Sequence, residues 1–216
     1  MITSLPNLLT LLRIVLIPLL IATFFMESEG VRIGPVAGSD WRWVALAVYA
    51  LAGVTDFFDG LVARMRGEHS NLGRFLDPVA DKLLVAAILL MLAGFDRLGG
   101  SVNLLAAAII LSREIFVSGL REFLADLRVS VPVSRLAKWK TTIQLLMLGF
   151  LLVGDAAPPV IPGEVIGIAG LWAAAVLTMV TGYDYLRAGL RHMLPEAGPE
   201  PEPEMEVERD ESGPGA

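Results

Sequence analysis

Four aspartates stand in two stretches of sequence that are otherwise rich in apolar residues. Asp56 and Asp59 belong to the first stretch, and Asp77 and Asp81 belong to the second. At roughly 100° per residue, both members of each pair fall on one face of a helix. The connecting segment, residues 64–72, is short enough to make the two helices antiparallel neighbours. We therefore expect the four carboxylates to converge at one end of a helix pair.

Carboxylates that converge repel one another, and each raises the pKa of the others unless cations neutralise them. Mg²⁺ and Mn²⁺ are hard divalent ions that prefer such oxygen ligands, and two of them can bind a pyrophosphate and stabilise both the attacking and the leaving oxygen. Gly60 and Ala63 lie on the face of the first pair, where small residues let a nucleotide approach the backbone. Alternatively, single aspartates cap helices or pair with Arg64, Arg74 or Lys82. That alternative accounts poorly for all four together.

Six apolar stretches can carry these side chains across a bilayer, whose core requires about 20 mostly apolar residues per helix. Hydrophobic residues make up 55% of the 216 residues and charged residues only 19%, with a mean hydropathy of +0.64. This composition is unusual for a water-soluble globular domain. We predict an all-α, polytopic membrane protein whose single domain, residues 1–194, encloses a polar cavity open to the cytoplasm. Its six transmembrane helices are expected near residues 7–26, 41–65, 75–95, 102–124, 136–154 and 160–187.

Basic residues between the predicted helices indicate how the protein crosses the membrane. If both termini are cytoplasmic, that side holds eleven lysines and arginines, whereas the other side holds only Arg32, Arg42 and Arg97. Basic residues accumulate on the cytoplasmic side of membrane proteins. We therefore expect both termini and both aspartate pairs to lie toward the cytoplasm.

The net charge of −6 comes from the C-terminal segment, residues 195–216, which has eight acidic residues and one arginine. The rest of the chain carries +1, so nothing marks it as a nucleic-acid-binding protein. The segment alternates glutamate with proline and has little to bury, which predicts a disordered acidic tail. The absence of cysteine excludes disulfides, thiol catalysis and cysteine metal sites.

The pattern Asp-x2-Asp-Gly-x2-Ala-Arg-x8-Gly-x3-Asp-x3-Asp runs without a gap from Asp56 to Asp81. It resembles the signature of the CDP-alcohol phosphatidyltransferases. Residues 6–13, 113–115, 119–122 and 138–142 further resemble the bacterial members of that family that use sn-glycerol 3-phosphate as acceptor. Ala137 is a departure, because a glycine is expected before the last of these stretches.

The resemblance implies a homodimeric enzyme of the bacterial inner membrane that transfers a phosphatidyl group from CDP-diacylglycerol to an alcohol and releases CMP. It implies two divalent cations, Mg²⁺ or Mn²⁺, as cofactors. It also implies roles for residues of the motif. Asp56, Asp59, Asp77 and Asp81 would bind metal, Asp81 would also be the general base, and Gly60, Ala63 and Arg64 would lie near the CDP group.

Two further groups of polar residues are candidates for substrate contacts. Asn7, Thr10 and Arg13 recur on one side of the first predicted helix and suit contacts to CDP-diacylglycerol. Alternatively, Asn7 caps the helix and Thr10 bonds its own backbone. A phosphorylated acceptor needs cations that grip its phosphate, and the basic residues of the later helices suit this role. These residues are Arg113, Arg121, Lys138 and Lys140.

The basic residues also allow other interpretations. The lysines could bind anionic lipid or follow the cytoplasmic bias of basic residues, and Glu114 could pair with Arg113 or Arg121.

The predicted function also has alternatives. The acceptor could instead be inositol phosphate or serine, or phosphatidylglycerol in cardiolipin synthesis. An ion-coupled transporter would also place carboxylates inside helices. However, the sequence has no visible repeat and its carboxylates lie toward one side, which disfavours a transporter.

Overall fold

The computed structural model describes residues 5–66, 71–126 and 135–193. These residues form only helices, apart from their connections and one isolated bridge between Ile33 and Val36. The helices lie where the apolar stretches predict them, so the all-α class is confirmed. They are α1 (Leu5–Ser28), α2 (Asp40–Arg66), α3 (Asn71–Gly94), α4 (Ser101–Asp126), α5 (Arg135–Val153), the short 3₁₀ helix η1 (Gly154–Ala156) and α6 (Gly163–Met193).

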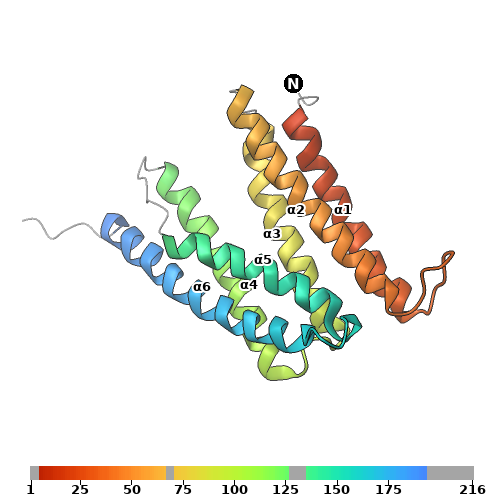
Figure 1. Ribbon diagram of the computed structural model, residues 1–216. Helices are drawn as coiled ribbons and strands as arrows, with labels where there is room; N and C mark the ends of the chain where they lie inside the picture. The colour runs from red at the N-terminus through yellow and green to blue at the C-terminus, as the bar shows by residue number, and fades with distance from the viewer. Residues whose placement is uncertain (1–4, 67–70, 127–134, 194–216) are drawn as a thin grey trace, which may run out of the picture.

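The helices form two groups of three (Figure 1). In the first group α1 packs against both α2 and α3, and in the second α6 packs against both α4 and α5. Contacts of α2 with α5, and of α3 with α4 and α5, join the groups. Successive helices run in opposite directions, so the starts of α1, α3 and α5 lie at the same end as the ends of α2, α4 and α6. The two groups diverge toward that end.

The packing of α2 and α3 corrects one sequence-based expectation. The two helices run antiparallel, but within the described residues they make no direct backbone contact, and α1 packs against both. The short connection therefore does not make them nearest neighbours. Instead, α1 contacts both helices, and it brings a cation and a hydroxyl to carboxylates that would otherwise repel one another.

The larger hydrophobic core lies toward one end of the bundle, and most of the buried polar residues lie toward the other. The core lies in the second halves of α1, α3 and α5 and in the first halves of α2, α4 and α6. Each helix contributes an almost fully buried residue: Leu20, Ala45, Ile88, Ile110, Leu148 and Leu171. Buried polar side chains in the other half include Asn7, Thr10, Arg13, Lys140 and Thr181. The main apolar core thus lies away from the end of the bundle that holds the aspartates and their partners.

Three of the described helices are long and apolar enough to cross a membrane: Asn7–Ser28, Ser101–Asp126 and Gly163–Arg187. On α1, large apolar side chains also face outward, and Val15 is 66% exposed. An apolar outer surface on a helix whose other face is already packed indicates contact with lipid. In α2 and α3, the aspartates reduce the hydropathy of helices that are otherwise long enough to span a bilayer.

Candidate active site

Arg13 of α1 joins aspartates on two other helices. Its Nη2 lies 2.8 Å from Oδ1 of Asp56 on α2, and its Nη1 lies 2.8 Å from Oδ1 of Asp81 on α3. The Arg13 side chain has no exposed surface, whereas those of Asp56 and Asp81 remain 51% and 55% exposed. A guanidinium is buried at tolerable cost only when carboxylates compensate its charge. The two aspartates do so while keeping about half of their surface accessible.

Thr10 lies about one helical turn before Arg13 and contacts a third aspartate of the motif. Its hydroxyl donates a hydrogen bond of 2.5 Å to Oδ1 of Asp77 on α3. The polar side of α1 therefore faces the carboxylates. Asn7, about one turn earlier again, is also buried. Contacts of these residues with CDP-diacylglycerol remain a prediction.

The C-terminal part of α2 holds the rest of the first aspartate pair and its neighbours. Asp59, Gly60, Ala63 and Arg64 belong to that helix, but their side chains lie outside the described residues. Gly73, near the start of α3, is buried. The metal role of Asp59 and the CDP contacts of Gly60, Ala63 and Arg64 therefore stay predictions.

The chemistry of the described aspartates fits a hard divalent cation. Asp56, Asp77 and Asp81 offer oxygen donors from two helices at the same end of the bundle, and Arg13 and Thr10 orient three of these carboxylate oxygens. Within the described part of the chain, no three acidic or histidine side chains cluster closely enough to enclose one ion as they stand. The fourth aspartate of the motif falls outside that part.

Two of the basic residues predicted to bind the acceptor contact Glu114 on α4. Lys140 of α5 donates to Oε1 of Glu114, and Nη1 of Arg113 lies 3.7 Å from the same oxygen. Arg113 also reaches α6, where its Nε donates to the carbonyl of Thr178 at 3.1 Å and its Nη2 donates to the hydroxyl of Thr181 at 3.0 Å. Glu114 thus links α4 to α5, and Arg113 links α4 to α6.

Arg121, two turns beyond Glu114, pairs with an aromatic residue. Its Nη2 donates to the Tyr185 hydroxyl at 3.2 Å, and its guanidinium lies 5.3 Å from the centre of that ring. The predicted alternative of a Glu114–Arg121 ion pair is therefore not what forms. Lys82 of α3 donates to the carbonyl of Pro78 at 2.8 Å, about one turn earlier on the same helix. The side chain of Lys138 lies outside the described residues.

A cavity of about 640 Å³ opens between α4 and α6. Its lining is mostly apolar, with Phe116, Met179 and Tyr183 among the side chains that form it. Arg113 is the charged side chain of this lining. The aspartates of the motif take no part in it.

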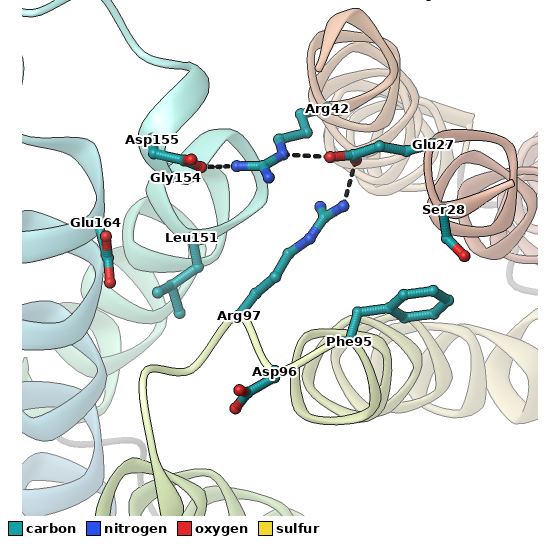
Figure 2. A pocket seen from close by; sticks show the side chains of 10 residues that line it. All are labelled: Glu27, Ser28, Arg42, Phe95, Asp96, Arg97, Leu151, Gly154, Asp155 and Glu164. Atoms are coloured by element: carbon teal, nitrogen blue, oxygen red, sulfur yellow. Dashed lines mark hydrogen bonds and ion pairs between the residues drawn. The ribbon is translucent and has the colours of Figure 1, made fainter. Parts of the chain in front are cut away.

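A second cavity, of about 450 Å³, lies at the end of the bundle away from the aspartates (Figure 2). Glu27 of α1 accepts from Nε of Arg42 on α2 at 2.7 Å and also from Arg97 in the α3–α4 connection, while Arg42 donates to Asp155 of η1. Burial lowers the pKa of the Arg97 guanidinium, and its hydrogen bond to Glu27 opposes this effect. These ion pairs tie the two helix groups together where they converge.

Sequence reasoning missed these partners. It placed Arg42 and Arg97 on the outer side, but nothing in the local pattern singled out Glu27, because its partners come from distant parts of the sequence. The pairing of Glu114 with Arg113 was among the predicted alternatives and is confirmed, since Glu114 is an acid next to Arg113 inside an apolar stretch. For the contact between Thr10 and Asp77, the only signal in the sequence was that Thr10 lies on the polar side of α1.

The protein belongs to the CDP-alcohol phosphatidyltransferase family, whose sequence profile matches residues 3–180. Several curated relatives bear the name CDP-diacylglycerol–glycerol-3-phosphate 3-phosphatidyltransferase. The relative from Rickettsia bellii is 43% identical over 86% of this chain and 94% of its own length. The relative from Shigella flexneri serotype 5b is 39% identical over 88% of this chain and 97% of its own length. The relative from Cereibacter sphaeroides is 35% identical over 89% of this chain and 98% of its own length.

Proposed function

We propose that this protein transfers the phosphatidyl group of CDP-diacylglycerol to sn-glycerol 3-phosphate, giving phosphatidylglycerophosphate and CMP. The observation that carries the proposal is the convergence of Asp56, Asp77 and Asp81 on the polar side of α1. The names of the relatives, which match over nearly their whole length, support the choice of acceptor. The location in a bacterial cytoplasmic membrane is supported by the apolar helices and by the bacterial origin of the relatives.

The reaction exchanges one bond at the phosphorus that bears the lipid. The bond from this phosphorus to the oxygen of the CMP phosphate breaks, and a bond to the 1-hydroxyl oxygen of glycerol 3-phosphate forms on the opposite side. Divalent cations, Mg²⁺ or Mn²⁺, held by Asp56, Asp59, Asp77 and Asp81, would supply neutralisation of the pyrophosphate charge. Positioning and charge neutralisation provide most of the acceleration in reactions of this class.

Asp81 accepts the proton of the attacking hydroxyl in this proposal. Its carboxylate is 55% exposed, while Arg13 holds one of its oxygens at 2.8 Å, so its orientation is fixed before substrate arrives. General-base assistance of this kind contributes about 10²–10⁴-fold. Gly60, Ala63 and Arg64, together with Asn7 and Thr10, are proposed to contact the CDP-diacylglycerol.

The acceptor phosphate is proposed to bind among Arg113, Arg121, Lys138 and Lys140. Lys140 and Arg113 both lie against the Glu114 carboxylate, so these two basic side chains are close to each other, as a shared phosphate site requires.

The remaining parts of the proposal concern the whole protein. All six helices are proposed to span the membrane, with both termini and a polar cavity on the cytoplasmic side. We also propose a homodimer, and a division of the chain into a transmembrane domain, residues 1–194, and an acidic tail, residues 195–216. The unequal distribution of basic residues supports the orientation.

An acceptor comparison with purified protein in detergent tests the activity. CDP-diacylglycerol would be mixed separately with labelled sn-glycerol 3-phosphate, inositol phosphate, serine or phosphatidylglycerol, and lipid product and CMP would be measured. We expect product with glycerol 3-phosphate, its loss in EDTA, and its return with Mg²⁺ or Mn²⁺. Product with another alcohol only would assign a different acceptor. CMP release in detergent would also exclude ion transport as the sole activity, because no membrane gradient exists there.

A pair of aspartate variants controls this assay. Asp77→Asn should lower the rate by at least about 100-fold, because it removes a ligand charge from the metal site. Asp126→Asn changes an exposed acid at the end of α4 and should retain full activity. Equal rates for the two variants would contradict the proposed role of the motif.

A further inference from the structure

Arg13 is in an unusual position for a residue expected to contact substrate. Its side chain has no exposed surface, and two of its nitrogens each lie 2.8 Å from a different aspartate. A guanidinium so enclosed presents no exposed nitrogen to a nucleotide phosphate. Its position therefore favours a role toward the aspartates themselves.

The architecture gives this contact a structural purpose. Asp56 and Asp81 belong to α2 and α3, which make no direct backbone contact within the described residues. Arg13 reaches both from α1, which packs against each of these helices. The guanidinium presents several donors in a rigid plane, so it can hold two carboxylates at a fixed separation. A lysine ammonium would supply the charge without that geometry.

Charge makes the contact important before any cation arrives. The aspartates repel one another, and repulsion would drive α2 and α3 apart or turn the side chains away. Arg13 compensates part of this charge from the buried side, and the opposite sides of both carboxylates keep about half of their surface exposed. Groups that orient metal ligands in this way commonly determine metal affinity.

We propose that Arg13 is a positioning residue that holds Asp56 and Asp81 at the separation required for cation binding. The inference rests on the proposed function, because it assumes that these aspartates bind metal. It assigns Arg13 to the scaffold of the metal site and not to the contacts with CDP-diacylglycerol expected from its sequence position. Without Arg13 the carboxylates lose their fixed arrangement, so cations bind more weakly and stabilise a structure that is otherwise looser.

The test measures Mn²⁺ binding to purified protein in detergent by electron paramagnetic resonance, and thermal unfolding in EDTA and in saturating Mn²⁺. Arg13→Gln should weaken Mn²⁺ binding by about 10–100-fold. It should also lower the melting temperature in EDTA, and saturating Mn²⁺ should restore most of this loss. Arg13→Lys should keep one positive charge but fall between wild type and Arg13→Gln in Mn²⁺ affinity, and it serves as the readout if the glutamine variant does not fold.

Arg97→Gln is the matched control. It also removes an arginine that is paired with a carboxylate, but one that is partly buried and lies at the opposite end of the bundle. It should lower the melting temperature equally with and without Mn²⁺ and leave Mn²⁺ affinity unchanged. Wild-type Mn²⁺ affinity in Arg13→Lys, or unchanged or tighter binding in Arg13→Gln, would overturn the positioning role. Absence of Mn²⁺ binding by the wild-type protein would instead overturn the metal site of the proposed function, and the inference with it.

Discussion

Lys140 is a buried basic residue whose charge is paired within the protein. Its side chain is 7% exposed and donates to the Glu114 carboxylate on the neighbouring helix. A lysine that merely marks the cytoplasmic side of a membrane protein would extend toward water or lipid headgroups. Its burial against Glu114 is therefore not explained by the cytoplasmic bias of basic residues alone, and its contact with the acceptor phosphate stays a prediction.

Replacing Lys140 by methionine tests that interpretation. Methionine keeps much of the length of the side chain but loses its charge, and a hydrogen bond to a charged group contributes about 1.5–3 kcal/mol. We expect the KM for glycerol 3-phosphate to rise about 10-fold or more, while the KM for CDP-diacylglycerol stays within about twofold. Steady-state kinetics with each substrate varied in turn would measure both. Trp139→Leu, a change at the exposed neighbour, is the control. A parallel rise in both KM values would argue for general disruption.

The positions of the aspartates could be predicted from the sequence, but their partners could not. The spacing of Asp77 and Asp81 was sufficient to predict that they share a face, because helical periodicity is a local property. The partners of these residues were not predictable in the same way. Whether Thr10 bonds its own backbone or Asp77 depends on which helix packs beside α1. Helical periodicity alone does not specify that neighbour.

At the scale of helices, small residues control the packing of α5 and α6. A Cβ atom added at Gly170 of α6 would lie 2.6 Å from the Cβ of Met147 on α5. The obstacle is the stem of a side chain and not its flexible end, so the helices would have to separate. Glycine at this position is therefore a requirement of close packing. Glycine destabilises a helix by about 1 kcal/mol relative to alanine, and the close contact of α5 with α6 offsets this loss.

Gly170→Ala should consequently lower the thermal stability of the purified protein. Overpacking costs about 1–3 kcal/mol, which outweighs the gain of about 1 kcal/mol in helix propensity. Gly119→Ala on α4 is the control, because its added Cβ would meet nothing within 4 Å. That variant should be as stable as wild type or more so. Thermal unfolding in detergent measures both, and a stabilised Gly170→Ala variant would contradict the packing argument.

The helices themselves were the most predictable part of the fold. Each forms within a few residues of its apolar stretch, since burial and lipid exposure both demand continuous apolar surface. Their arrangement was less predictable. The packing of α1 against both α2 and α3 brings together charges from three helices, and the ion pairs of Glu27 join segments far apart in sequence. Such contacts depend on the assembled bundle.

For the whole molecule, the separation of an apolar half from a polar half predicts a defined orientation in the membrane. The chain has no cysteine, so single introduced cysteines report sidedness without background. Val160 in the connection before α6 is 90% exposed, and Asp126 at the end of α4 is also exposed. A membrane-impermeant maleimide applied to intact spheroplasts should label Val160→Cys but not Asp126→Cys. Both should react after permeabilisation, and the reverse pattern in intact spheroplasts would invert the proposed orientation.

The position of α1 between α2 and α3 has a consequence for biogenesis. Arg13 enters the bilayer with the first helix, and an arginine at the centre of a helix raises the insertion energy by about 2.5–3.5 kcal/mol. Asp56 can compensate it once α2 has emerged, but Asp81 becomes available only after α3 has been synthesised. Nascent chains truncated before α3 should therefore remain near the insertion machinery, where site-specific photo-crosslinking would detect them. Chains that include α3 should be released into lipid.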